Sequence, residues 1–222
     1  MVYTYKMHIA SFDIGKVNFA FCIEKVDPLK FPKTTIPKVK RYTSDGLVTP
    51  EFEQVLDEVC SEGEVVLYKN VNLTTESPGT KYLDDTVFLN MYKVLDTYES
   101  EFEKCEIIII EQQMSFGMKK INTMALKLGQ HCRSYFLYKY RDTKQIIEFP
   151  AYHKTQVLGA GKKLTKPMRK KWSVQKCADI LLQRGDTATL DILSEAGKRD
   201  DLADVITQLQ AFKFLRFVSR DI

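Results

Sequence analysis

The hydrophobic and polar positions of the N-terminal quarter predict a β-hairpin followed by a loop. Residues 8–13 alternate and then reach Gly15, which indicates a strand that runs into a tight turn. Residues 17–26 (VNFAFCIEKV) are rich in aromatic and β-branched side chains, so we expect a second strand that pairs antiparallel with the first. Four prolines and many lysines occur in residues 27–50, which predicts a loop or an insertion with a short strand near residues 39–42.

The rest of the chain alternates between helical and strand-like spacing. Helices are predicted at residues 51–60, within 82–105, and at 122–140, 154–158, 167–184 and 200–217, and strands at residues 64–73, 106–111 and 144–149. The run Ile107–Ile110 lies between Glu106 and Glu111, the pattern of a strand buried on both faces. This order predicts a single α/β domain over residues 1–222, with a mixed five-stranded sheet, helices on both faces, and an insertion or expanded region within residues 27–105.

The composition agrees with one folded domain. The chain has 222 residues, of which 44% are hydrophobic and 28% charged, so a disordered or fibrous protein is excluded. No run approaches the roughly 18 apolar residues of a membrane span, and no signal or transit sequence is recognisable. The five cysteines are widely spaced without a C-x-x-C pair, which is typical of free thiols. We therefore expect an intracellular protein in a reducing compartment, without a membrane association.

The formal net charge of +4 conceals a strong segregation of charge along the chain. Residues 45–111 carry 4 basic and 16 acidic side chains, whereas residues 151–184 carry 9 basic and 1 acidic. Tyr152, His153 and Trp172 lie within this basic segment, together with a Gly-x-Gly turn. The combination suits a phosphate backbone, although a solvated basic face would have the same composition.

Four carboxylates stand where the pattern favours other residues. Asp13 ends the first strand, Glu111 ends the buried apolar run, and Asp201 and Asp204 are three residues apart on one helix face. Singly, each has an ordinary interpretation as a turn cap, an ion-pair partner or a first-turn carboxylate. Together they provide hard oxygen donors for Mg²⁺ or Mn²⁺, and two such ions about 4 Å apart can promote phosphodiester hydrolysis. Asp200, beside the pair, is expected to cap the helix.

Several motifs together resemble the RuvC-type Holliday junction resolvases, and most of all their poxvirus-like viral branch. These motifs are SFDIGK at 11–16, IEQ at 110–112 with ALKLGQ at 125–130, FPAYHK at 149–154 with VLGAG at 157–161, and DLAD at 201–204. The resemblance extends over residues 9–209, with a poor match in residues 27–105. It implies a ribonuclease-H-like fold and a homodimer, with the helix from Asn122 onward as part of the dimer face.

The resemblance also implies a function and its residues. Asp13, Glu111, Asp201 and Asp204 would be the catalytic metal ligands, holding two Mg²⁺ ions for which Mn²⁺ can substitute. Two sites would nick opposed strands of a four-way DNA junction and leave 5′-phosphate ends. The DNA contacts implied are Lys16, Phe116, Lys119, Lys120, Lys154, Lys163, Lys170 and Lys171. The viral branch favours the host-cell cytoplasm as the location, with the nucleus and the mitochondrion as alternatives.

Three other functions fit parts of this pattern. Another ribonuclease-H-like nuclease, acting on flaps, R-loops or RNA hybrids, would have the same carboxylates. A non-catalytic junction-binding scaffold would keep the basic segment, but the complete acidic set argues against it. A sugar-kinase or actin-like ATPase shares the Asp-x-Gly turn before a hairpin. It would also need a second Asp-Gly loop and a glycine-rich adenosine site, neither of which is evident among the ten glycines.

Overall fold

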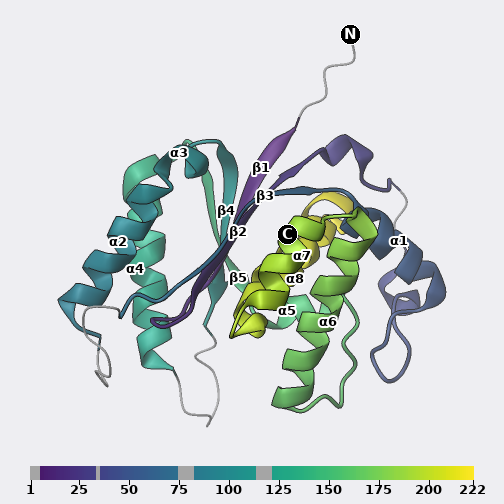
Figure 1. Ribbon diagram of the computed structural model, residues 1–222. Coiled ribbons are helices and arrows are strands. Elements are labelled where there is room, and N and C mark those ends of the chain that lie inside the picture. The colour runs from purple at the N-terminus through teal and green to yellow at the C-terminus, as the bar shows by residue number, and fades with distance from the viewer. Residues whose placement is uncertain (1–5, 34–35, 75–82, 114–121) are drawn as a thin grey trace.

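One mixed five-stranded sheet lies at the centre of the molecule, in the spatial order β3-β2-β1-β4-β5 (Figure 1). The computed structural model describes residues 6–33, 36–74, 83–113 and 122–222. β1 (Met7–Asp13), β2 (Phe19–Val26) and β3 (Glu64–Val71) are joined by antiparallel pairing. β4 (Cys105–Gln112) runs parallel to β1, and β5 (Gln145–Pro150) runs parallel to β4. The carboxyl ends of β1, β4 and β5 therefore meet at one edge of the sheet.

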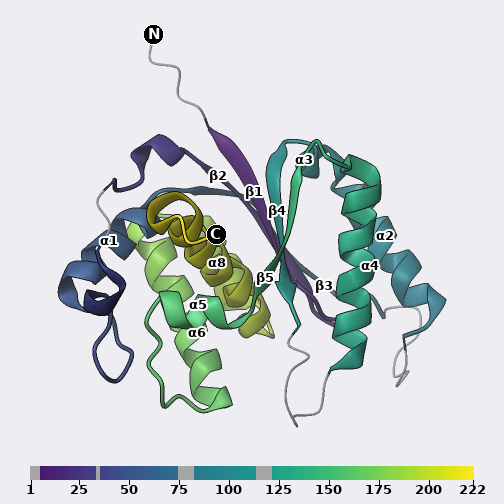
Figure 2. The same cartoon turned by 180° about the vertical axis from the view of Figure 1, so that it is seen from behind.

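Helices cover both faces of this sheet, as the front and back views show (Figures 1 and 2). One face carries α2 (Asp85–Thr97), the short α3 (Glu99–Phe102) and α4 (Thr123–Tyr140). The other carries α1 (Pro50–Ser61), α5 (Tyr152–Val157), α6 (Lys166–Arg184), α7 (Thr187–Glu195) and α8 (Arg199–Lys213), which continues as a π-helical turn, Phe214–Ser219. No helix in the described parts of the chain is long and apolar enough to cross a membrane.

Each face of the sheet has its own hydrophobic core. Under α2 and α4, the ring of Phe12 packs against Phe21, Phe102 and Phe136, with centroids 5.3–5.5 Å apart. On the opposite face, α8 packs directly on β1 and β2, and nearly every residue from Leu202 to Lys213 is buried. Because α8 is enclosed in this way, a side chain on its first turns has a fixed position relative to the ends of the strands.

A buried ionic group ties α8 to β2 at the end of the sheet away from Asp13. Glu24 of β2 is fully buried and pairs with Arg184 at 2.9 Å and with Lys213 at 3.2 Å. Gln210 donates a further hydrogen bond to Glu24 at 2.8 Å. Burial alone would raise the pKa of Glu24, but the two cations outweigh burial and lower that pKa below its ordinary value. The carboxylate is therefore held ionised inside the core.

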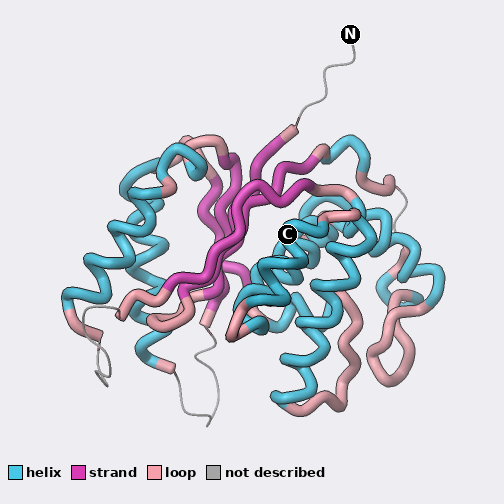
Figure 3. The backbone as a smooth tube through the Cα atoms, viewed as in Figure 1, coloured by secondary structure: helices cyan, strands magenta, loops and turns pink. Residues whose placement is uncertain are grey.

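The predicted fold class is confirmed, and the tube view shows the strands as one continuous layer (Figure 3). The prediction of a short strand near residues 39–42 is wrong. Lys38–Lys40 form a 3₁₀ turn, and the nearby pairing is a single bridge between Tyr42 and Val48. Val39 is almost fully exposed, because this segment lies outside the sheet.

Two further differences concern helices. The helical spacing within residues 82–105 belongs to two helices, α2 and α3, that are separated at Tyr98. Helix α7 was not predicted from the hydrophobic pattern, because only two of its nine residues are buried; Asp186 caps it by accepting a hydrogen bond from the amide of Thr189 at 3.0 Å. Asp200 was expected to cap α8, and this is wrong: Lys198 occupies the cap position.

Candidate active site

Three carboxylates from separate elements meet around one ammonium group at the edge where the parallel strands end. Asp13 is the last residue of β1, Glu111 lies near the end of β4, and Asp204 lies in the second turn of α8. The ammonium is that of Lys154 in α5, which lies 2.8 Å from Glu111 Oε1 and 2.6 Å from Asp204 Oδ2. Asp13 shares a side-chain hydrogen bond with Glu111. The structure thus brings together four residues that the sequence singled out.

The pKa values of these buried side chains are shifted in different directions. Burial raises the pKa of Asp13 well above its usual range, and the negative charge of Glu111 raises it further. Burial alone would raise the pKa of Glu111 too, but Lys154 and the hydrogen bond from Asp13 outweigh it and lower that pKa. Asp13 therefore retains a proton more readily than Glu111. Burial alone would lower the pKa of Lys154, but Glu111 and Asp204 raise it, so its ammonium stays charged.

A second set of polar side chains orients the carboxylates. Ser173 of α6 donates a hydrogen bond from Oγ to Asp204 Oδ1 at 2.6 Å. Gln113 donates to Glu111 Oε2 at 3.2 Å. Gln208 of α8 donates to Ser11 Oγ at 3.0 Å and to the carbonyl of Phe12 at 3.1 Å, which fixes α8 beside Asp13. These residues are not predicted from local patterns; only Gln208 carries a signal in the sequence, because it follows Asp204 by four residues and so shares its helix face.

The other two carboxylates at the start of α8, Asp200 and Asp201, pair with different lysines. Asp201 pairs with Lys198 at 2.8 Å, and burial raises the pKa of Asp201. Asp200 pairs with Lys170 of α6. Asp201 therefore faces a lysine of its own helix start, whereas Asp204 faces Lys154 and Ser173.

The chemistry of this donor set suits a hard divalent cation, since carboxylate oxygens are the ligands that Mg²⁺ and Mn²⁺ prefer. Within the described residues, no three carboxylate, imidazole or thiol side chains are arranged so that they could hold a metal ion. The ammonium of Lys154 supplies the positive charge between Glu111 and Asp204. The residue types fit a divalent cation, and Lys154 acts as the stand-in cation.

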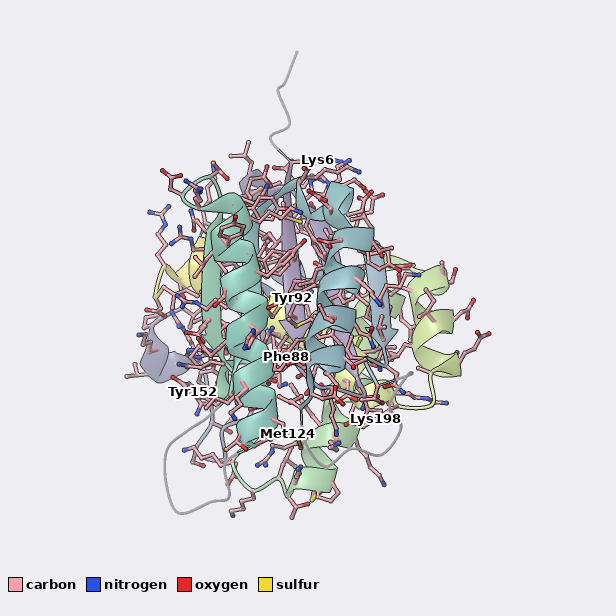
Figure 4. All side chains as sticks on the ribbon, turned by 90° about the vertical axis from the view of Figure 1, so that its left-hand side faces the viewer. Lys6, Phe88, Tyr92, Met124, Tyr152 and Lys198 are labelled. Atoms are coloured by element: carbon pink, nitrogen blue, oxygen red, sulfur yellow. The ribbon has the colours of Figure 1, made fainter. Side chains whose placement is uncertain are left out.

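Several basic side chains line a cavity at the start of α8. A cavity of about 850 Å³ between α6 and the α7–α8 connection is lined by Lys170, Lys171, Lys198 and Arg199, among others. Lys163 is exposed and lies 3.9 Å from Asp45. Figure 4 places Tyr152, Met124 and Lys198 at one end of the molecule, opposite Lys6 at the start of β1.

Of the remaining predicted DNA contacts, only Lys16 lies within the described residues. Lys16 lies three residues after the end of β1, and its carbonyl accepts a hydrogen bond from the amide of Leu73 at 2.8 Å. Phe116, Lys119 and Lys120 lie outside the described residues.

Comparisons with known proteins give both sequence relatives and a shared fold. No protein-family model matches the chain. The uncharacterized protein 170L of Invertebrate iridescent virus 6 is 36% identical, covering 94% of this chain and 89% of 170L. The uncharacterized protein 97L of Invertebrate iridescent virus 3 is 30% identical, covering 92% of this chain and 98% of 97L.

Among solved structures, the fowlpox virus resolvase in complex with Holliday junction DNA superposes with a TM-score of 0.53 at 17% identity, covering 93% of this chain and 97% of the resolvase. The yeast mitochondrial Holliday junction resolvase Ydc2 gives a TM-score of 0.50 at 11% identity, and the match covers 96% of this chain and 86% of Ydc2. At these identities the likeness establishes the fold, which confirms the architecture that the motifs implied. The chain therefore belongs to the family of the iridescent virus proteins 170L and 97L, and its fold is that of the Holliday junction resolvases.

Proposed function

We propose that this chain is a metal-dependent, structure-specific DNA endonuclease that resolves four-way junctions by paired nicks in opposed strands. One observation carries the proposal: Asp13, Glu111 and Asp204 meet around a buried cation at the edge of the sheet, within a resolvase fold. Three carboxylates gathered in a largely buried space are unfavourable without a positive charge, so such an arrangement needs a reason beyond stability.

The residues have separate tasks in this proposal. Asp13, Glu111, Asp201 and Asp204 would hold Mg²⁺, or Mn²⁺ in its place, as two ions per site. When bound, these ions supply water activation and charge neutralisation at a phosphodiester. Lys154 is well placed to leave its carboxylate partners and contact a non-bridging phosphate oxygen. Hydrolysis would leave 5′-phosphate ends.

Residues outside the acidic group would position the reacting strand. Ser173 holds Asp204 Oδ1 and so fixes the direction of the other carboxylate oxygen. Lys170 and Lys171, on the first turns of α6, line the basic cavity beside Asp200 and would contact neighbouring phosphates.

A homodimer accounts for paired nicks, because one site can cut only one strand at a time. The outer face of α2 and α4 offers a surface for this contact: Tyr138 is 83% exposed, Leu89 is 56% exposed, and the ring of Phe88 lies 4.2 Å from that of His131. A dimer contact across this face would bury both of these exposed side chains.

The proposed location is the host-cell cytoplasm, at a site of viral DNA replication. The two relatives are virus proteins, and Cys22, Cys60, Cys105, Cys132 and Cys177 are free and buried, which fits a reducing compartment.

A panel of substrates tests the proposal against its rivals. Purified protein is incubated with a four-way junction, a flap, an R-loop, an RNA–DNA hybrid and a linear duplex, in Mg²⁺ and in EDTA. We expect rapid, Mg²⁺-dependent nicking of the four-way junction above all others. Preferential cutting of the flap, R-loop or hybrid would favour another nuclease of the same fold, and tight junction binding without cutting in Mg²⁺ or Mn²⁺ would favour a scaffold.

A further inference from the structure

A second cavity lies beside α5, between the loop of residues 41–49 and the basic segment that follows β5. Its volume of about 530 Å³ is within the range of pockets that hold small ligands. Two tyrosines, Tyr42 and Tyr152, and two cations, Lys162 and Arg169, contribute to its lining. The loop belongs to the expanded region for which the sequence suggests no role.

The loop that forms one wall is held in place by hydrogen bonds. Tyr42 pairs with Val48 in an isolated bridge, and its hydroxyl donates to the carbonyl of Val157 at 3.1 Å. The amide of Lys162 donates to the carbonyl of Asp45 at 2.8 Å. The opposite walls of the cavity are thereby joined, so the cavity is a built feature of the fold.

Glycine permits the close approach of the two segments. Gly159 has a φ of +74°, and a Cβ atom at this position would lie 2.5 Å from Val48 Cγ1. Any larger residue would push the loop away from the basic segment. The Gly-x-Gly turn therefore serves the packing of this loop.

The lining has the chemistry of a nucleotide site. Tyr152 is 42% exposed, so its ring is accessible for stacking against a base. Lys162 Nζ donates to the carbonyl of Ser44 at 3.1 Å, and Arg169 donates to the carbonyl of Leu164 at 3.2 Å. Carbonyl oxygens are neutral, so these contacts position the two cations without cancelling their charge, which leaves them suited to a phosphate.

The cavity and the acidic site share two helices. α5 carries Tyr152 at the cavity and Lys154 at the carboxylates, only two residues apart. On α6, Arg169 lines this cavity and Ser173 donates a hydrogen bond to Asp204 of the acidic site. Because Tyr152 and Lys154 lie on one helical turn, a DNA strand bound at Lys154 would have a neighbouring nucleotide near the cavity.

We propose that this cavity binds one nucleotide of the DNA strand that passes through the acidic site, with the base on Tyr152 and the phosphate near Lys162 and Arg169. The inference rests on the proposed function, and it gives the 41–49 loop a role in holding the substrate.

The test compares the full-length wild type with three variants in EDTA. Tyr152→Ala removes the ring, Tyr152→Phe keeps it, and Leu182→Ala is the control, since Leu182 is exposed on α6 outside the cavity lining. Four-way junctions carry 2-aminopurine at successive positions along the strand. We expect the fluorescence at one or two positions near the crossover to be quenched by the wild type and Tyr152→Phe but not by Tyr152→Ala. Tyr152→Ala should bind about tenfold more weakly.

Two outcomes would overturn the inference. In the first, Tyr152→Ala binds the junction and quenches 2-aminopurine as well as the Leu182→Ala control. In the second, Tyr152→Phe loses as much binding and quenching as Tyr152→Ala, which would assign the effect to the hydroxyl group. If the wild type still cuts the junction in Mg²⁺, only the nucleotide cavity is refuted. If the wild type neither binds nor cuts branched DNA, both the cavity and the proposed function are refuted.

Discussion

The ammonium of Lys154 lies 2.8 Å from Glu111 Oε1, so a side chain from α5 supplies the positive charge at the end of β4. The same ammonium lies 2.6 Å from Asp204 Oδ2 in α8. Lys154 is mostly buried, and without it these carboxylates would face one another in a space that water screens poorly. Lys154 therefore stabilises the acidic site in the absence of metal.

Removing this ammonium should destabilise the metal-free protein. We expect Lys154→Met to lower the free energy of unfolding in EDTA by about 3 kcal/mol, because it leaves buried carboxylates unpaired. Urea unfolding followed by circular dichroism measures the change. Lys144→Met is the matched control, since Lys144 lies beside the opposite end of β4 and donates to the carbonyls of Glu103 and Cys105.

A divalent cation should compensate for the lost ammonium. A ligand that binds only the folded state raises stability, and the carboxylates freed in Lys154→Met would bind Mg²⁺ without displacing a lysine. We expect Mg²⁺ to raise the melting temperature of Lys154→Met more than that of the wild type. An equal rise in both proteins would mean that Lys154 and the metal do not share a position.

The hydroxyl of Ser173 should matter for metal affinity although it is not a predicted ligand. Ser173→Ala removes the donor to Asp204 Oδ1 and leaves that carboxylate free to turn. Outer partners of this kind typically change metal affinity by about 10- to 100-fold. A titration of nicking rate against Mg²⁺ concentration should therefore shift to higher concentration. Ser61→Ala, at the exposed end of α1, should leave the titration unchanged.

The buried Glu24 group predicts a pH dependence of stability. Its pKa is lower in the folded chain than its ordinary value of 4.5, so the stabilisation is complete above about that pH and is lost as the pH falls through the folded pKa. Glu24→Gln leaves Arg184 and Lys213 without their carboxylate, and we expect a loss of about 3–5 kcal/mol at neutral pH.

Urea unfolding across a pH series checks both parts of this prediction. The difference between Glu24→Gln and the wild type should shrink as the pH falls below 4.5. The exposed Glu64→Gln serves as the control. A difference that stays constant down to the acid-unfolding range would contradict the assignment of the charge to Glu24.

Local patterns predicted the strands and the main helices because each of them has a buried face with its own period. Asp13 and Glu111 could be found because each interrupts such a pattern at the end of a strand, and Asp204 because it lies three residues after Asp201 on one helix face. The contacts of Lys154, Ser173 and Gln208 could not be found in this way: each joins segments 30 or more residues apart, and no local period records such a pairing.

The packing of the 41–49 loop also depends on a contact between distant segments that its local sequence does not predict. Its prolines and lysines indicate a loop, but nothing in its own sequence indicates that Val48 packs on Gly159, more than a hundred residues later. The helix α7 was missed for the opposite reason, because its exposed position leaves only a weak hydrophobic pattern.

The most direct test of the central claim is Mg²⁺-dependent cleavage of a four-way junction by the wild type and by Asp13→Asn, Glu111→Gln and Asp204→Asn, with junction binding measured for each protein in EDTA. We predict that the wild type makes paired nicks in opposed strands only when Mg²⁺ or Mn²⁺ is present, and that each variant still binds the junction but does not cut it. Wild-type cleavage rates in any of the three variants, or no cleavage by the wild type in either metal, would contradict the proposed function.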